Sequence, residues 1–274
     1  MGSGISQVVA QAGLRVTSVD VSDAALARGM ERVERSLGRL VQRERLSDAD
    51  ARAVQARITP STDLEASAAD ADHAIETVIE DLDAKMDVLR RLDSVCRDDV
   101  VLASNTSQFS ISRLAAATQR RDRVIGSHWF NPPPVMTLIE LIRGVETSEE
   151  TLEVARELAH LYGKQTVVCT KDTPGFITSR LIALLMVEAA RLVDEGVASV
   201  EDINKACVLG FGHAQGPLDT ADLSGLDTVT HVADSLREQY GERFLVPQNL
   251  RALYNAGHFG RKTGRGFSSY DTAT

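Results

Sequence analysis

The 274-residue chain lacks features that define several classes of protein. It has three cysteines, Cys96, Cys169 and Cys207, an odd and widely spaced set that excludes a disulfide framework and shows no paired metal-ligand motif. We therefore expect reduced thiols in a reducing compartment and no metal site. The longest strongly apolar run, residues 181–187, is far shorter than the roughly 20 residues that a membrane-spanning helix needs, so we expect no membrane partner.

A basic surface and a secretory leader are also missing. The chain has 30 Lys plus Arg against 39 Asp plus Glu, a formal net charge of −9, which argues against a nucleic-acid binder because such proteins need a basic face for phosphates. Residues 1–7 lack the basic and apolar regions of a signal peptide. We expect a cytoplasmic protein.

In the first two thirds of the chain, short β-branched runs alternate with helical stretches. This alternation is typical of parallel strands joined by crossover helices. The predicted strands cover residues 15–20, 74–78, 100–105, 123–128, 138–142 and 165–168. The predicted helices cover residues 5–12, 24–43, 82–95 and 149–161. We predict an α/β, doubly wound Rossmann-type domain over residues 1–171.

The pattern changes at the pair Pro174-Gly175, which we interpret as a domain boundary. The predicted helix over residues 176–195 is apolar around most of its circumference, which indicates burial on several sides. Further helices are predicted over residues 200–208, 223–240 and 249–256, before a glycine-rich tail over residues 260–267. We predict an all-helical domain over residues 172–274.

The start of the chain resembles the second part of a dinucleotide site. Gly2 and Gly4 precede an amphipathic helix, and Asp20 ends the strand that follows. An acid at this position hydrogen-bonds an adenosine ribose and repels a 2′-phosphate, so Asp20 favours NAD over NADP; a simple turn residue is the alternative. The first strand and the full Gly-x-Gly-x-x-Gly fingerprint are absent. Because this would leave unpaired edges on both neighbouring strands, we expect a truncated start or another element in the gap.

The strongest local signal surrounds His128. The strands on either side of the proline-rich turn can bring His128 and Glu140 together. A histidine with a near-neutral pKa is a suitable proton acceptor, and a neighbouring carboxylate fixes its tautomer and stabilises the imidazolium. A solitary histidine at a strand end would more often be structural, but the paired glutamate and the turn at Asn131 favour catalysis.

Two further strand ends carry polar residues. Asn105 and Ser107 follow a predicted strand at the carboxyl edge of the sheet, where such folds bind ligands; the alternative is a helix N-cap by a Ser or Thr before Ile111. Glu80 and Lys85 lie where the preceding predicted strand, residues 74–78, gives way to a helix. Acids at a helix N-terminus more often complement the helix dipole than touch a ligand.

Together these motifs resemble the L-3-hydroxyacyl-CoA dehydrogenases, in particular the bacterial 3-hydroxybutyryl-CoA dehydrogenase type. The similarity extends from residue 2 to residue 270. It rests on Ser-Asn-Thr-Ser at residues 104–107, His-Trp-Phe-Asn-Pro-Pro-Pro-Val-Met at 128–136, Asp-Thr-Pro-Gly-Phe at 172–176, Gly-Pro-Leu-Asp at 216–219, Gly-Leu-Asp at 225–227 and Gly-Arg-Lys-Thr-Gly-Arg-Gly-Phe at 260–267.

The resemblance implies NAD-dependent oxidation of a (S)-3-hydroxyacyl-CoA in a cleft between the two domains, and a homodimer formed by the helical domain. It implies that His128 is the general base, that Glu140 orients it, and that Ser107 touches cofactor and substrate. The implied cofactor contacts are Gly2, Asp20, Glu80, Lys85, Asn105, Ser107, Asn131 and Lys262. The implied coenzyme A contacts are Ser36, Arg43 and Ser107.

The chain departs from the family pattern in three places. Ser179 stands where the family usually has an active-site Asn, and the shorter hydroxyl would reach less far toward the thioester carbonyl. Arg43 stands in place of a Lys. The family pattern has a strand and a Gly-x-Gly turn before the residues that match Met1 and Gly2, and we interpret Met1 as an internal methionine of a Gly-x-Gly-x-Met-Gly turn. Two alternative functions remain open: a dehydrogenase of a free hydroxy or sugar acid, and a structural or interaction protein unable to bind NAD.

Overall fold

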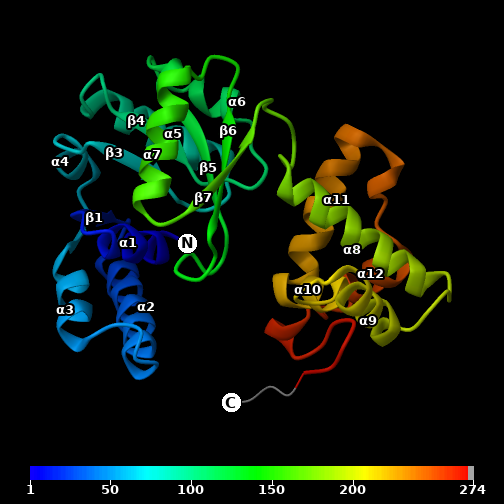
Figure 1. Cartoon of the computed structure of the whole chain (residues 1–274). Helices are drawn as coiled ribbons and strands as arrows, with labels where there is room; N and C mark the ends of the chain where they lie inside the picture. Colours follow the sequence, from blue (N-terminus) through cyan, green and yellow to red (C-terminus); the bar gives the residue numbers. More distant parts are fainter. Residues whose placement is uncertain (271–274) are drawn as a thin grey trace. The chain divides into compact units, whose positions relative to one another are not determined.

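The computed structural model describes residues 1–270 and divides into two compact units, Met1–Thr173 and Pro174–Thr274 (Figure 1). The first unit is α/β and the second is helical, so the predicted fold class is confirmed. No helix within the described residues combines the length and the apolar character that a membrane crossing requires.

The α/β unit contains two separate sheets, β1-β2 and β3-β4-β5-β6-β7. The strands are β1 (Val16–Val19), β2 (Ile58–Ser61), β3 (His73–Glu76), β4 (Val101–Ser104), β5 (Val124–Trp129), β6 (Leu138–Arg143) and β7 (Gln165–Cys169). The helices are α1 (Gly2–Gln11), α2 (Asp23–Gln42), α3 (Asp48–Ala56), α4 (Leu64–Ala68), α5 (Leu82–Val95), α6 (Ile111–Ala115) and α7 (Glu149–Leu161), with the 3-10 helix η1 (Arg121–Arg123). No hydrogen-bonded strand pair joins the two sheets, since β1 and β3 do not pair.

Two strand predictions need correction. The pair β5-β6 is antiparallel, whereas every other neighbouring pair is parallel. Residues 130–137 are too few for a crossover, because a parallel connection needs a dozen or more residues, so the chain turns back on itself. The strand β2 was not predicted because Pro60 interrupts its β-branched residues, and proline is tolerated only on an edge strand such as this one.

Helix α1 links the two sheets of this unit through residues on its buried side. Ile5 and Val8 belong to a hydrophobic cluster with the large sheet, including Ile125 of β5. Ala10 belongs to a second cluster, with α2, α3 and Ile58 of β2. Figure 1 shows α1 near β1, with α2 and α3 following it along the chain. The apolar contacts of α1 thus hold together two sheets that share no hydrogen-bonded strand pair.

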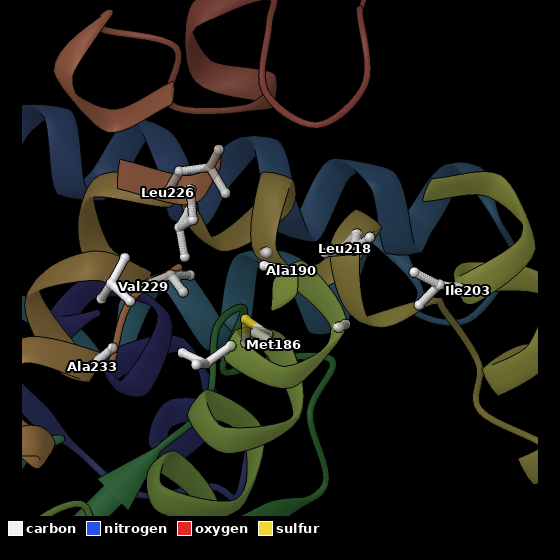
Figure 2. Packing of buried hydrophobic residues seen from close by; sticks show 12 residues of the cluster. Met186, Ala190, Ile203, Leu218, Leu226, Val229 and Ala233 are labelled. Carbon is white, nitrogen blue, oxygen red and sulfur yellow. The ribbon is translucent and has the colours of Figure 1, made fainter. Parts of the chain in front are cut away.

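The second unit is built around helix α8 (Thr178–Asp194), which contacts α10, α11 and α12. Its other elements are α9 (Val200–Phe211), α10 (Pro217–Ser224), α11 (Leu226–Tyr240), η2 (Glu242–Phe244), α12 (Gln248–Asn255) and η3 (Arg261–Thr263). Met186 and Ala190 of α8 pack among Leu218, Leu226 and Val229, as Figure 2 shows. One side of α8 stays open to solvent, since Leu181 is 64% exposed.

The single helix predicted over residues 223–240 is two helices. Gly225 separates α10 from α11 and has a φ of 95°, in the left-handed region that interrupts helical geometry. An added Cβ there would lie 2.7 Å from Asp227 Oδ1. The helical periodicity on both sides of the glycine hid this break in the sequence.

Candidate active site

His128 and Glu140 form a buried pair on neighbouring strands. The register of the antiparallel pair places His128 of β5 directly opposite Glu140 of β6. The distance from His128 Nδ1 to Glu140 Oε2 is 2.9 Å. Glu140 is fully buried and His128 is 8% exposed. The turn between the strands therefore brings together two side chains separated by twelve positions in the sequence.

This pairing defines the chemistry available to the imidazole. An ionised carboxylate only accepts hydrogen bonds, so Nδ1 carries the proton and Nε2 is the basic nitrogen. When Nε2 takes a proton, the buried negative charge of Glu140 stabilises the imidazolium. Phe130 packs against the imidazole, with ring centroids 4.7 Å apart, and restricts its rotation. The arrangement is suited to general-base catalysis on a hydroxyl group.

A buried lysine supports the proline-rich turn after β5. Lys164 Nζ donates hydrogen bonds to the backbone oxygens of Pro133 and Met136, at 2.8 and 2.6 Å. Burial lowers the pKa of Lys164. Asn131, predicted to contact the cofactor, is exposed at the start of the turn that Lys164 holds. Lys164 was not predicted as a site residue, because an isolated lysine after a helix gives no sign that its ammonium is inside the molecule.

The loop after β4 lies beside the candidate base. Asn105 Oδ1 accepts a hydrogen bond from the backbone N–H of Trp129 at 2.9 Å, which joins this loop to the end of β5. Glu80 Oε1 accepts hydrogen bonds from Ser107 N at 3.0 Å and from Thr106 Oγ1 at 2.5 Å. The predicted polar residues at the ends of β3 and β4 therefore form one hydrogen-bonded group.

The N-cap of α6 is Ser110, not a residue of the 104–107 segment. Ser110 Oγ accepts a hydrogen bond from Arg113 N, and Asp172 accepts hydrogen bonds from Ser110 Oγ, Ile111 N and Ser112 N. A Ser before Ile111 thus caps this helix, as the alternative interpretation stated, but the capping residue is Ser110, and Asn105 and Ser107 do not cap it. They hydrogen-bond instead to Glu80 and to the backbone of Trp129.

Lys85 lies inside the α/β unit. Its side chain is fully buried, and its ammonium contacts Glu76 Oε1 at 3.0 Å, Glu80 Oε2 at 3.3 Å and the backbone oxygen of Asn105 at 3.0 Å. Glu76, the last residue of β3, was not predicted as a site residue. An acid that ends an apolar strand run was the available signal, but it is indistinguishable in sequence from a solvated turn residue.

The N-terminus of α1 has features that fit a dinucleotide. The helix has no side-chain N-cap, so its first N–H groups offer the anion-binding position that helix N-termini provide for phosphates. A Cβ on Gly2 would lie 2.8 Å from Thr77 Oγ1, so glycine permits a close backbone approach. Asp20 is exposed at the end of β1, and the apolar residues Val21 and Ile79 that follow β1 and β3 are 95% and 74% exposed. These residues fit a ribose and an adenine.

Ser36 of α2 and Arg43, the residue directly after α2, lie on one helical face. With Arg32 and Arg39 they are spaced four, three and four residues apart, which places them within one narrow arc of a helix with 3.6 residues per turn. The three arginines are exposed, whereas Leu37 on the opposite face is buried. Three guanidinium groups on one face can bind an anionic ligand despite the net negative charge.

Ser179 and Lys262 belong to the helical unit. Ser179 lies in the first turn of α8 and is half-buried. Lys262 Nζ is 2.5 Å from Asp227 Oδ2. Burial raises the pKa of Asp227, but hydrogen bonds, the largest from the Lys262 ammonium, outweigh burial and leave the pKa below its ordinary value.

The glycine-rich segment that carries Lys262 is fastened to a buried carboxylate. Asp222 is fully buried and accepts hydrogen bonds from Phe267 N, Ser268 N and Tyr270 Oη, at 3.0, 3.0 and 2.8 Å. Burial, reinforced by Asp222, raises the pKa of Tyr270 to about 12. A Cβ on Gly266 would lie 2.0 Å from Asp222 Oδ1, so only glycine fits there.

The three cysteines are free thiols and are all buried. Within residues 1–270, no group of three or more His, Cys, Asp or Glu side chains could hold a metal ion. The candidate site of the described chain is therefore built from the histidine pair, the hydrogen-bonded loops and the helix N-terminus.

Comparison with known proteins gives a consistent result over the whole chain. The family model described as "3-hydroxyacyl-CoA dehydrogenase, NAD binding domain" matches residues 1–173, and "3-hydroxyacyl-CoA dehydrogenase, C-terminal domain" matches residues 175–270. The chain is 41% identical to a probable 3-hydroxybutyryl-CoA dehydrogenase of Bacillus subtilis, over 100% of this chain and 95% of that protein.

Two further relatives resemble the chain to the same degree. It is 40% identical to a 3-hydroxybutyryl-CoA dehydrogenase of Mycobacterium tuberculosis, over 98% of this chain and 95% of that protein. The crystal structure of (S)-3-hydroxybutyryl-CoA dehydrogenase from Ralstonia eutropha has a TM-score of 0.95 and 41% identity, and covers 99% of this chain and 96% of the other.

Proposed function

Since the chain belongs to the 3-hydroxyacyl-CoA dehydrogenase family, we propose that it oxidises a short (S)-3-hydroxyacyl-CoA such as (S)-3-hydroxybutyryl-CoA to the 3-oxoacyl-CoA. The chain is an NAD-dependent oxidoreductase. The observation that carries the proposed chemistry is the buried hydrogen bond of 2.9 Å between His128 and Glu140.

His128 acts as the general base of the reaction. Its Nε2 takes the proton of the 3-hydroxyl group, while Glu140 holds Nδ1–H and stabilises the imidazolium. NAD, when bound, accepts the hydride that leaves C3. In the reverse direction His128 returns the proton to the oxygen of the 3-oxo group. Ser107 contacts substrate and cofactor in this proposal, which is supported by the hydrogen bond that its backbone N–H donates to Glu80.

The carboxyl edge of the sheets would hold the cofactor. Gly2 and the N–H groups at the start of α1 would bind the pyrophosphate, and Asp20 would accept hydrogen bonds from the adenosine ribose. The remaining contacts come from the group around Glu80 and from Asn131 and Lys262. The proposed cofactor residues are Gly2, Asp20, Glu80, Lys85, Asn105, Ser107, Asn131 and Lys262.

The basic face of α2 binds the phosphates of coenzyme A. Arg43 supplies the cation and Ser36 a hydroxyl on the same helical face, with Arg39 between them. At the acyl end, the hydroxyl of Ser179 contacts the thioester carbonyl. Ser179 is shorter than the amide usual in the family, so it holds this carbonyl less firmly.

The helical unit forms the homodimer interface. Several of its large apolar side chains are exposed: Leu209, Phe211 and Leu223 are 74%, 73% and 56% exposed. Exposed apolar surface of this kind is buried when two copies associate. Leu181 of α8 is 64% exposed. Light scattering coupled to gel filtration tests this proposal, with twice the 29.7 kDa chain mass as the expected result.

The activity is tested by following NADH oxidation with acetoacetyl-CoA, alongside acetoacetate as the free acid. Saturable turnover of the thioester supports the proposal. Turnover of free hydroxy or oxo acids alone would assign the chain to a sugar-acid or hydroxy-acid dehydrogenase. Absence of both turnover and NADH binding would favour a structural or interaction role.

A further inference from the structure

The turn between β5 and β6 contains three consecutive prolines. Pro132, Pro133 and Pro134 have no backbone N–H, so at these positions the turn offers only carbonyl acceptors to the rest of the protein. Apolar packing adds little on the outer side of the turn, since Val135 and Met136 are 69% and 40% exposed. A turn of this composition is best fixed by a hydrogen-bond donor from another segment.

Lys164 supplies that donor from the segment after α7. Its side chain is buried, and its ammonium donates hydrogen bonds to the backbone oxygens of Pro133 at 2.8 Å and Met136 at 2.6 Å. An ammonium has three donor protons and no acceptor, which suits a segment that offers carbonyl oxygens. The next residue, Gln165, donates its N–H to the backbone oxygen of Thr137 at 2.8 Å. Two successive residues therefore hold three carbonyl groups of the turn.

We propose that Lys164 is a positioning residue that fixes the turn at residues 130–137 and thereby orients His128 and Asn131 for the reaction. His128 lies in β5 two residues before the turn, and Asn131 is the second residue of the turn. The inference rests on the proposed function, in which His128 is the general base and Asn131 contacts the cofactor.

The same turn also packs against the N-terminal part of α1. A Cβ on Gly4 would lie 3.0 Å from both Cγ and Cδ of Pro133, so the proline ring lies against the first turn of this helix. The proposed pyrophosphate contacts come from the N–H groups at this helix start. Because Lys164 holds the carbonyl of the same proline, its ammonium fixes a segment that joins the strand of the base to the helix of the cofactor.

The energetics favour a positioning role over a stabilising one. Taking an ammonium out of water costs free energy, and both hydrogen-bond partners of Lys164 are neutral carbonyl groups. Burial accordingly lowers the pKa of Lys164. Because an apolar side chain of similar length would avoid this cost, the lysine contributes a fixed geometry of the turn more than it contributes unfolding free energy.

Trp129 provides a local reporter for this turn because it is the only tryptophan of the chain. It directly follows His128 and is 3% exposed, and its ring centroid lies 6.0 Å from Lys164 Nζ. A loosened turn would give acrylamide access to the indole. Quenching of the tryptophan fluorescence by acrylamide measures that access in the absence of substrate and cofactor.

The test compares Lys164→Met with a variant that is destabilised elsewhere in the same unit. Lys164→Met keeps an unbranched side chain of similar length and removes the three donors. The control is Val54→Ala, which removes packing from the cluster that Ala10 forms with α2, α3 and β2. Each protein is measured for thermal unfolding, acrylamide quenching, turnover number per NADH-binding site, and KM for acetoacetyl-CoA.

We expect Lys164→Met to lower the turnover number per site about tenfold, because a small misplacement of a reacting group lowers the rate strongly. Its quenching constant should rise about twofold as the turn opens locally. Its KM for the thioester should stay within about twofold of the parent, since the proposed coenzyme A contacts lie on another helical face. Val54→Ala should unfold at a lower temperature than the parent but match it in quenching and in turnover per site.

A Lys164→Met protein with the parent's turnover per site and quenching constant overturns the inference and leaves Lys164 with a role in folding alone. If Lys164→Met does not fold, the same measurements on Lys164→Gln decide, because its amide is neutral and one bond shorter. Lower turnover with stronger quenching in Lys164→Gln supports the inference, and parental values overturn it.

Failure of the proposed function has a different signature. If the parent does not reduce acetoacetyl-CoA, the proposed function fails. The quenching comparison between the parent and Lys164→Met needs no substrate, so it still shows whether Lys164 fixes the turn beside His128.

Discussion

His128 and Glu140 face one another in register across an antiparallel strand pair that is flanked on both sides by parallel pairs. Because the chain reverses direction between β5 and β6, the two residues lie opposite each other, with His128 Nδ1 2.9 Å from Glu140 Oε2. A crossover connection would instead carry the chain over the sheet before the next strand begins.

The first prediction concerns this pair. We expect His128→Ala to reduce the turnover number for acetoacetyl-CoA reduction by about 10²- to 10⁴-fold, the usual contribution of a positioned general acid or base. Glu140→Gln keeps a hydrogen-bonding group but loses the charge, so its effect should be in the same direction and smaller. NADH binding should stay within twofold in both.

A matched control for the histidine is available on the surface. His160, in the last turn of α7, is exposed, and His160→Ala should leave turnover unchanged. Full activity of His128→Ala would exclude His128 as the general base and leave the buried pair with a structural role.

The second prediction concerns the basic face of α2. Arg43→Gln should raise the KM for acetoacetyl-CoA several-fold with little change in turnover number, because it removes binding energy remote from the reacting carbon. The same variant should be indistinguishable from the parent with an acetoacetyl thioester of N-acetylcysteamine, which has no phosphates. Equal effects on both substrates would mean that Arg43 does not recognise coenzyme A.

The third prediction uses two glycines with opposite surroundings. A Cβ on Gly126 in β5 would lie 2.7 Å from Ile111 Cδ1, so Gly126→Ala should destabilise the α/β unit by about 1–3 kcal/mol through overpacking. Gly38 lies inside α2 with nothing within 4 Å of an added Cβ. Gly38→Ala should therefore stabilise the protein, by about 0.5–1 kcal/mol.

Urea unfolding of both glycine variants provides the measurement. If the urea midpoint of Gly126→Ala were equal to or above that of the parent, Ile111 and its neighbours would move aside without loss of unfolding free energy. That result would contradict the close packing around β5.

The fourth prediction concerns acid stability. Burial lowers the pKa of His73 from its ordinary 6.5 to about 4, so between these values the unfolded chain binds a proton that the folded chain does not. Unfolding free energy should therefore fall as the pH drops from 6.5 to 4. Each pKa unit corresponds to about 1.4 kcal/mol, and because the side chain is partly exposed we expect a loss of about 2 kcal/mol.

The contribution of His73 is isolated by comparing the parent with His73→Gln at several pH values. The difference in unfolding free energy between the two proteins should change across this pH window and stay constant above pH 6.5. A difference that does not vary with pH would rule out a buried neutral His73.

The sequence by itself determined the order of most helices and strands, the division into an α/β and a helical unit, and the pairing of His128 with Glu140. These follow from local rules: hydrophobic periodicity, the chemistry of the proline turn, and the fact that strands joined by a short turn become neighbours. The dinucleotide features were also local, since a helix start and the strand end at Asp20 are visible in the chain itself.

Only the tertiary structure decided the pairing of β2 with β1 and the environment of the buried cations. Lys85 and Lys164 look in sequence like ordinary surface residues, because a charged side chain is buried only where distant segments supply its partners. For Lys85 those partners come from residues 76, 80 and 105, and for Lys164 from residues 133 and 136. No periodicity records such contacts, since they exist only once the strands are assembled.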